Sequence, residues 1–174
     1  MDVPEIFNQK MFIIDQKLLS VRDTYVIKDE SQNELGRAVR KLLSLGPKIT
    51  IKDTEGNEVG KIEGKFISIR REMKFIDWNG QVRGVLKKKL LKLFGSEYWV
   101  EDSNGNRILT IKGKFTAHNY KIIDDKTGKV VGEVSKKWLS LRDSYALKIY
   151  SDELDPFLAL CIVIAIDVVE HPGR

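Results

Sequence analysis

Apolar and polar residues alternate along this chain in short stretches that recur about every 24 residues. The clearest mark of the recurrence is a lysine followed by a short, mostly apolar stretch, which occurs six times at spacings of 24, 24, 24, 25 and 23 residues. A period of this length indicates one structural unit used repeatedly along the chain. The six lysines are Lys17, Lys41, Lys65, Lys89, Lys114 and Lys137.

Two further features keep the same period. A glycine precedes four of the lysines by five residues, at Gly36, Gly60, Gly84 and Gly132. Alternating segments such as 49–53 end in an acidic residue, and turn-forming sequences such as Asp-Trp-Asn-Gly at 77–80 follow them. Each unit therefore reads as strand, tight turn, strand. Because parallel strands need longer crossovers, we expect about twelve antiparallel strands, the first at 11–14 and the last near 145–150.

The C-terminal segment has a different pattern, because residues 157–166 are apolar on every face. Asp155 and Pro156 resemble a helix N-cap followed by proline at the first helical position. The β-branched residues in this segment would also be compatible with a strand. Thirteen residues is long for one strand, however, so we predict a helix at about 156–170. Such a helix would be about 22 Å long, and a membrane core is about 30 Å thick, so we expect no transmembrane span.

A helix that is apolar all round must be buried on all sides. A barrel of more than eight strands leaves a lumen that this helix would fill, and closure removes the exposed sheet edges. The sequence therefore predicts a mainly β fold, a closed antiparallel barrel of about twelve strands, or six hairpin repeats, around a buried hydrophobic C-terminal α-helix. With 174 residues, 42% of them hydrophobic, we expect a single domain over 1–174.

The six hairpin repeats and the terminal apolar helix resemble the tubby C-terminal-like superfamily over about 10–170, and most closely its LURP-one-related branch. The resemblance implies lipid chemistry, since tubby proteins bind phosphoinositides through a basic patch and the related phospholipid scramblases are associated with calcium-dependent lipid movement. LURP-one-related proteins have no settled activity. No stretch matches the tubby site residue by residue. The Asp-Ser-Asn-Gly-Asn sequence at 102–106 lacks the layout of a calcium loop and is interpreted as a turn.

Charge adds a candidate binding surface. The formal net charge is +5, and the five acids within 151–174 concentrate the positive charge in the first 150 residues. Such a basic body suits anionic phospholipid headgroups, although solubility alone would also explain it. Nucleic acid is not expected as a partner, since no recognition helix is apparent and the aromatic residues occupy core-like repeat positions.

The candidate binding residues are Arg70, Arg71, Lys87, Lys88, Lys89 and Lys92. Alternation would divide the lysine run between the two faces of the barrel wall unless it lies at a strand end.

No catalytic constellation is present in the sequence, and we expect no enzyme activity, no cofactor and no metal site. His118 and His171 have no neighbouring nucleophile and no metal-ligand spacing. Cys161 lies in the apolar run, where a buried structural thiol is expected. Asp167 is an acid in an apolar helix. We expect it to reach solvent or an arginine at the helix end, with a functional role as the alternative.

These observations favour a non-enzymatic binding module that docks on anionic phospholipid or phosphoinositide headgroups through a basic rim. The main alternative is a structural scaffold that binds a protein partner, followed by a scramblase-like lipid protein, a nucleic-acid-binding protein and an enzyme. The acidic N-terminus lacks the features of a signal peptide, and a single cysteine suits a reducing compartment. We therefore expect a cytoplasmic protein, peripheral to a membrane where it binds lipid.

Overall fold

The structure, a computed structural model, describes residues 2–19, 22–43, 46–67, 70–91, 95–139 and 144–171. At the strand-end residues 17–19, 22–23, 42–43, 67, 70, 90–91 and 95, only the main chain is described. Among the described residues, no helix has the length and apolar character that crossing a membrane requires.

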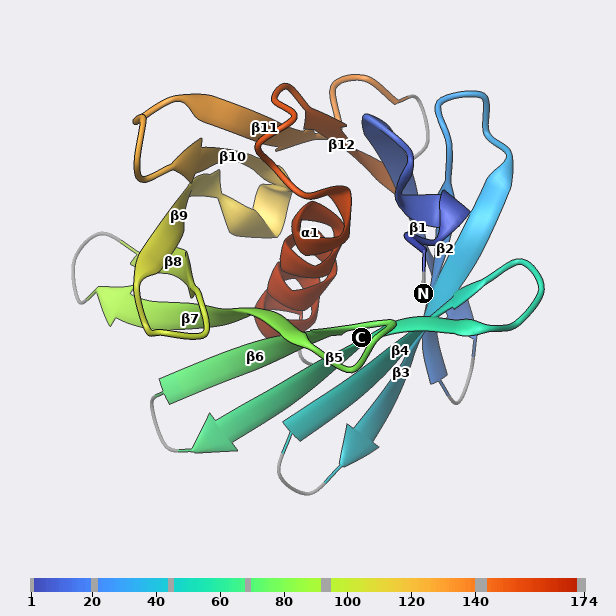
Figure 1. The fold of residues 1–174 in the computed structure, drawn as a ribbon, viewed down its shortest axis with the longest axis horizontal. Helices are drawn as coiled ribbons and strands as arrows, with labels where there is room; N and C mark the ends of the chain where they lie inside the picture. The colour runs from blue at the N-terminus through green and yellow to red at the C-terminus, as the bar shows by residue number, and fades with distance from the viewer. Residues whose placement is uncertain are drawn as a thin grey trace.

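Twelve antiparallel strands form one closed barrel, as the repeat predicts (Figure 1). Each strand pairs with its neighbours in the chain, and β1 closes the barrel by pairing with β12. Closure gives every described strand a partner on both sides, so that none of them is an edge strand. The strands are β1 (Met11–Leu19), β2 (Arg22–Lys28), β3 (Glu34–Leu43), β4 (Gly46–Asp53), β5 (Glu58–Ile67), β6 (Arg70–Asp77), β7 (Val82–Leu91), β8 (Gly95–Glu101), β9 (Arg107–Lys114), β10 (Asn119–Asp124), β11 (Val130–Ser135) and β12 (Ser144–Ile149).

The acid that ends each predicted strand organises the tight turn after it. The main-chain N–H of Asn57 donates to Asp53 Oδ1 at 2.8 Å, and that of Asn106 donates to Asp102 Oδ1 at 2.9 Å. Asp29 and Asp77 accept the same bond from the residue four positions later. Residues 102–106 therefore form a hairpin turn of the repeated kind, as predicted.

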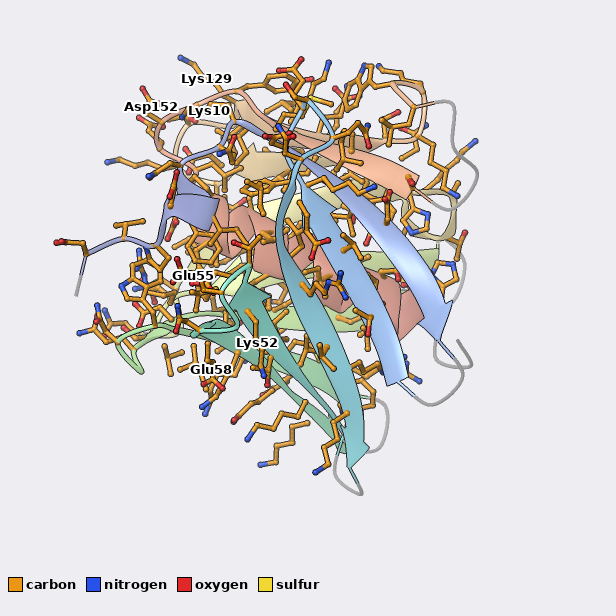
Figure 2. All side chains as sticks on the ribbon, turned by 90° about the vertical axis from the view of Figure 1, so that its right-hand side faces the viewer. Lys10, Lys52, Glu55, Glu58, Lys129 and Asp152 are labelled. Carbon is orange, nitrogen blue, oxygen red and sulfur yellow. The ribbon has the colours of Figure 1, made fainter. Side chains whose placement is uncertain are left out.

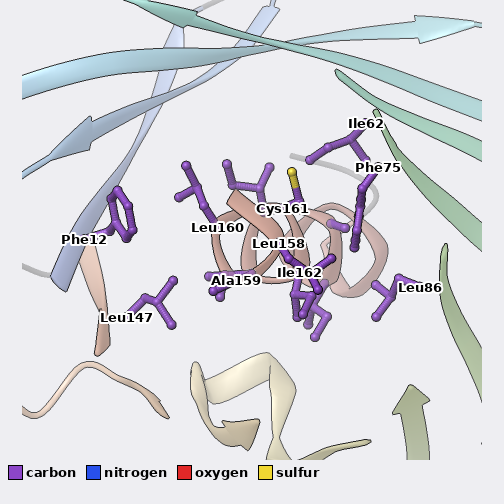
Figure 3. Packing of buried hydrophobic residues seen from close by; sticks show 14 of the residues in the cluster. Phe12, Ile62, Phe75, Leu86, Leu147, Leu158, Ala159, Leu160, Cys161 and Ile162 are labelled. Atoms are coloured by element: carbon purple, nitrogen blue, oxygen red, sulfur yellow. The ribbon is translucent and has the colours of Figure 1, made fainter. Parts of the chain in front are cut away.

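The C-terminal segment forms the helix α1 (Pro156–Glu170), with the predicted bounds. Asp155 caps it, since its side chain accepts a hydrogen bond from the Phe157 N–H at 3.0 Å, and Pro156 is the first helical residue. All residues from 157 to 169 are buried, and the helix runs through the barrel with apolar side chains of the wall packed around it (Figures 1 and 3). The predicted helical plug is confirmed.

The repeated glycines make room for the start of this helix. A Cβ atom added at Gly60 would lie 2.5 Å from Phe157 Cε2, and one at Gly84 would lie 3.1 Å from Leu158 Cδ1. A Cβ atom at Gly132 would lie 2.9 Å from Leu154 Cδ2. Any larger residue at these positions would overlap the segment that enters the barrel, which explains why the glycines recur at a fixed place in the unit.

Two short 3-10 helices lie at opposite ends of α1. The first, η1 (Glu5–Phe7), covers the end where α1 begins, and the Phe7 ring centroid lies 5.2 Å from that of Phe157 and 5.5 Å from that of Trp78. The second, η2 (Phe115–Ala117), replaces a simple turn between β9 and β10. It brings polar residues to the end where α1 finishes.

Candidate functional site

The predicted basic residues lie on β6 and β7, and the structure divides them between the two faces of the wall. Lys87 and Lys89 lie on the outer face, with Lys89 exposed and Lys87 Nζ 2.8 Å from Glu101 Oε2. Lys88 points inward, where its side chain keeps 10% of its exposure and Nζ lies 2.7 Å from Glu170 Oε1. Arg71 also points inward, and its Nη1 donates to the Val169 carbonyl oxygen at 3.2 Å.

Lys88 and Arg71 therefore hold the end of α1 rather than present a surface. The side chain of Arg70 and the whole of Lys92 lie outside the described residues. The division of the lysine run follows from its position inside β7, because successive side chains of a strand point to opposite faces.

A larger set of lysines faces outward on five consecutive strands. Each is exposed and none forms an ion pair with a described residue. Three of them are repeat lysines on β3, β5 and β7, so the repeat places them at the same end of the barrel wall. Neighbouring strands lie about 4.8 Å apart, which separates lysines on alternate strands by roughly 10 Å. The five are Lys41, Lys52, Lys65, Lys74 and Lys89, and Figure 2 shows Lys52 on the outer surface.

Other outward lysines of the same strands are paired with acids. Lys48 Nζ lies 3.6 Å from Glu63 Oε1, and Lys61 Nζ lies 2.6 Å from Glu58 Oε1. Exposed pairs of this kind are mutually neutralising and contribute little to stability. Among the described outward side chains of β3 to β7, the five lysines form no such pair, and we refer to them as the outer lysine set.

A second polar group of residues lies inside the barrel, around Asp167. This residue is 2% exposed. Tyr25 Oη donates to its Oδ2 at 2.8 Å, while His118 Nε2 and His171 Nδ1 lie 2.5 Å and 3.0 Å from its Oδ1. Burial raises the pKa of Asp167, but the bonds and charges of His118, Tyr25 and His171 outweigh it and the net shift is downward. The carboxylate thus stays charged deep in the fold.

Asp167 therefore differs from the sequence-based expectation, since it contacts neither solvent nor an arginine. Two of its partners, Tyr25 and His118, come from distant parts of the chain. His118 follows η2 in a left-handed backbone conformation with φ 48°, and this turn points its ring inward. His171 is the C-cap of α1, one helical turn after Asp167.

Glu170 is the second carboxylate at this end of the barrel. It accepts hydrogen bonds from Lys88 Nζ at 2.7 Å and from Tyr98 Oη at 2.5 Å. Burial and the bond to Glu170 raise the pKa of Tyr98 well above its usual value, so the phenol remains a donor. Each carboxylate thus has its own partners, and their negative charges are compensated separately.

Two tyrosine hydroxyls and one imidazole nitrogen complete this interior region. The hydroxyls of Tyr120 and Tyr145 and the Nδ1 atom of His118 are buried without a hydrogen-bond partner among the described residues. The Tyr145 ring stacks on His118 with centroids 4.3 Å apart. Burial and then the charge of Asp167 raise the pKa of both tyrosines. Unpartnered buried polar atoms are costly, and each calls for an explanation, of which a bound water or ion is one.

Two shallow hollows of about 320 and 410 Å³ lie at the opposite end, beside the N-terminal segment. They share Gln9 and Lys10, and neither is lined by the residues around Asp167. The interior cluster was missed by sequence reasoning because its members are far apart along the chain. The one available signal was the polar residue at position 118, where the other repeats have an aliphatic one.

Comparison with known proteins agrees with this architecture. None of the curated proteins matches the chain. An X-ray structure of a protein from Arabidopsis thaliana is similar, with a TM-score of 0.60 over 97% of this chain and 98% of that chain. At 14% sequence identity this likeness shows a shared fold alone. The LURP-one-related family model matches residues 10–167, which is most of the sequence, and the chain therefore belongs to the LURP-one-related family.

Proposed function

We propose that this chain is a non-enzymatic binding module that docks on anionic phospholipid headgroups through the outer lysine set. The observation that carries the proposal is the exposed, uncompensated lysine on each of the five consecutive strands β3 to β7. Membership of a family with a tubby-like fold supports a lipid ligand. The protein would then be cytoplasmic and peripheral to the membrane.

Electrostatic attraction supplies the binding energy in this proposal. A lysine close to an anionic membrane contributes about 1 kcal/mol, and the attraction is screened over about 10 Å at 0.1 M salt. Lys89 belongs to the outer lysine set, and Arg70 and Lys92 stay candidates for it from the sequence. Lys87 lies on the same outer face but is paired with Glu101. Lys88 and Arg71 are assigned to holding the helix instead, because their cationic groups contact Glu170 and Val169.

The test is co-sedimentation with phosphatidylcholine vesicles, with and without phosphatidylserine, at 50 and 200 mM salt. We expect binding to the anionic vesicles alone, and weaker binding at the higher salt. The variant K41Q/K65Q/K89Q should bind about a hundredfold more weakly, since three contributions of about 1 kcal/mol are lost.

The matched control is K112Q/K114Q/K121Q, which removes the same charge from exposed positions of β9 and β10. It should bind nearly as the native chain does. Equal loss in both triple variants would contradict a defined docking face. A folded native chain that binds neither kind of vesicle would refute the proposal and favour a scaffold that recognises a protein partner.

A further inference from the structure

We propose that His118, Asp167 and His171 form a binding site for a divalent transition-metal ion of the zinc type, at the end of the barrel where α1 finishes. The three residues supply two imidazole nitrogens and one carboxylate oxygen, all within 4.8 Å of one another. This inference is independent of lipid docking, because none of the three side chains belongs to the outer lysine set.

The distances suit a metal with little rearrangement. His118 Nε2 and His171 Nδ1 both face the same oxygen, Asp167 Oδ1, at 2.5 Å and 3.0 Å. In a tetrahedral zinc site the bonds are about 2.0–2.2 Å long, which places neighbouring ligand atoms about 3.3–3.6 Å apart. Moving each imidazole nitrogen away from Asp167 Oδ1 by roughly 1 Å or less would therefore bring these two pairs of atoms to the spacing of a zinc site.

The surroundings hold the carboxylate in position. Tyr25 Oη donates to Asp167 Oδ2, so that Oδ1 is directed toward the two imidazoles. Residues that hydrogen-bond to a metal ligand without contacting the metal orient that ligand and strengthen metal binding. Asp167 is fixed on a fully packed helix, and the left-handed conformation of His118 aims its ring at that helix. A residue other than glycine in this conformation stores strain, which is typical of functional positions.

The ligand chemistry selects the class of metal. Imidazole and carboxylate together suit zinc and its neighbours, whereas calcium takes six to eight oxygen ligands. The ion would take the place of the hydrogens between Asp167 Oδ1 and the two imidazole nitrogens, His118 Nε2 and His171 Nδ1. A neutral imidazole would then carry its proton on its other ring nitrogen, and a charged one would release a proton to solvent. Three protein ligands leave a fourth position for water. The hydroxyls of Tyr120 and Tyr145 have no hydrogen-bond partner among the described residues, and both lie near enough for the charge of Asp167 to raise their pKa.

Metal binding would join the helix to the barrel wall. His118 comes from the connection between β9 and β10, and it lies 49 residues before Asp167 in the chain. An ion bound only by the folded chain stabilises that chain by mass action. Zinc should therefore lock the helix inside the barrel.

The experiment uses the full chain, free of any affinity tag and stripped of metal with a chelator that is then removed. Zinc chloride should bind with one ion per chain in calorimetry. It should raise the melting temperature by about 5–10 °C at a hundredfold excess over the dissociation constant. Calcium chloride should cause no shift. Absence of zinc binding to the native chain would overturn the proposal.

Variants assign the ligands. H118Q and H171Q should lose the zinc-induced shift, and Y25F should weaken binding at least about tenfold. The control is C161A, which removes the one thiol of the chain and should keep the shift. Native-like zinc binding in the H118Q/H171Q double variant would refute the assignment. If a variant fails to fold, cobalt binding to the native chain should perturb the imidazole resonances of both histidines, and unperturbed resonances would equally refute it.

Discussion

Lys88 and Lys89 are neighbours in β7, but their side chains lie on opposite faces of the barrel wall. Lys88 Nζ is bonded to Glu170 and lies 5.3 Å from the ring centroid of Tyr98. Lys89 is exposed and has no ion pair with a described residue. Two adjacent residues of one type thus belong to different parts of the protein, and substitutions should separate their roles.

We expect K88M to lower the free energy of unfolding by about 3 kcal/mol, because Glu170 would remain largely buried with its charge uncompensated by lysine. K89M should change it by less than about 0.5 kcal/mol, since the side chain is exposed. Urea denaturation of both variants measures the difference. Equal effects would contradict the inward position of Lys88.

The sequence predicted that the lysine run would be divided, but it could not say which lysine points inward. A shift of one residue in strand register exchanges the two faces, and only the pairing of β7 with β6 and β8 fixes it. Asp167 illustrates the same limit. Its position in the helix was evident from the sequence, while its partners Tyr25 and His118 depend on which strands the barrel brings around the helix end.

At the scale of elements, Asp155 makes two polar contacts at the N-terminus of α1. The Asp155 side chain accepts a hydrogen bond from the Phe157 N–H, and its Oδ2 also lies 2.7 Å from Arg83 Nη2. We expect D155A to cost about 1–2 kcal/mol of stability through loss of the cap. D155N keeps a capping oxygen but loses the ion pair with Arg83, so it should cost less. Thermal melts of both variants test this order, and an equal loss in D155N and D155A would show that the ion pair, and not the cap, accounts for the stabilisation.

The repeat glycines give a second prediction at this scale, because the neighbours that they face differ in rigidity. A Cβ atom at Gly36 would lie 2.2 Å from the main-chain oxygen of Lys52, whereas one at Gly84 meets side-chain atoms of Val100 and Leu158 at 2.9 and 3.1 Å. Backbone cannot yield as side chains can. G36A should therefore cost at least about 3 kcal/mol and G84A about 1 kcal/mol in urea denaturation. The reverse order would mean that the strands β3 and β4 can separate locally.

For the whole molecule, the period of the repeat made the fold predictable. Six similar hairpins, one apolar helix and its Asp-Pro start leave few arrangements that bury the helix and avoid open edges. The interior cluster was not predictable in the same way, because η2 interrupts the repeat and places His118 where the other units have an aliphatic residue. The regular repeat of the sequence thus predicts the barrel, and the position where the repeat is interrupted, at η2 and His118, indicates where a site lies.

The same repetition should make the barrel sensitive to acid. Burial is the largest effect on the pKa of Asp53 and raises it, but the hydrogen bonds within the turn together outweigh it and the net shift is downward. Hydrogen bonds within the turns likewise outweigh burial and lower the pKa of Asp102 and Asp124. A carboxyl whose folded pKa lies below its unfolded value of about 3.9 stabilises the fold above that pH. The stabilisation is lost as the pH falls through the folded pKa, so stability should fall below about pH 4.

D53N/D102N/D124N cannot titrate at these turns, and its urea midpoint should change less between pH 5 and pH 2.5 than that of the native chain. The control D2N/E30Q/E153Q removes equal charge from exposed positions and should keep the native pH dependence. If both triple variants followed the native curve, the turn carboxylates would not be the source of the acid sensitivity.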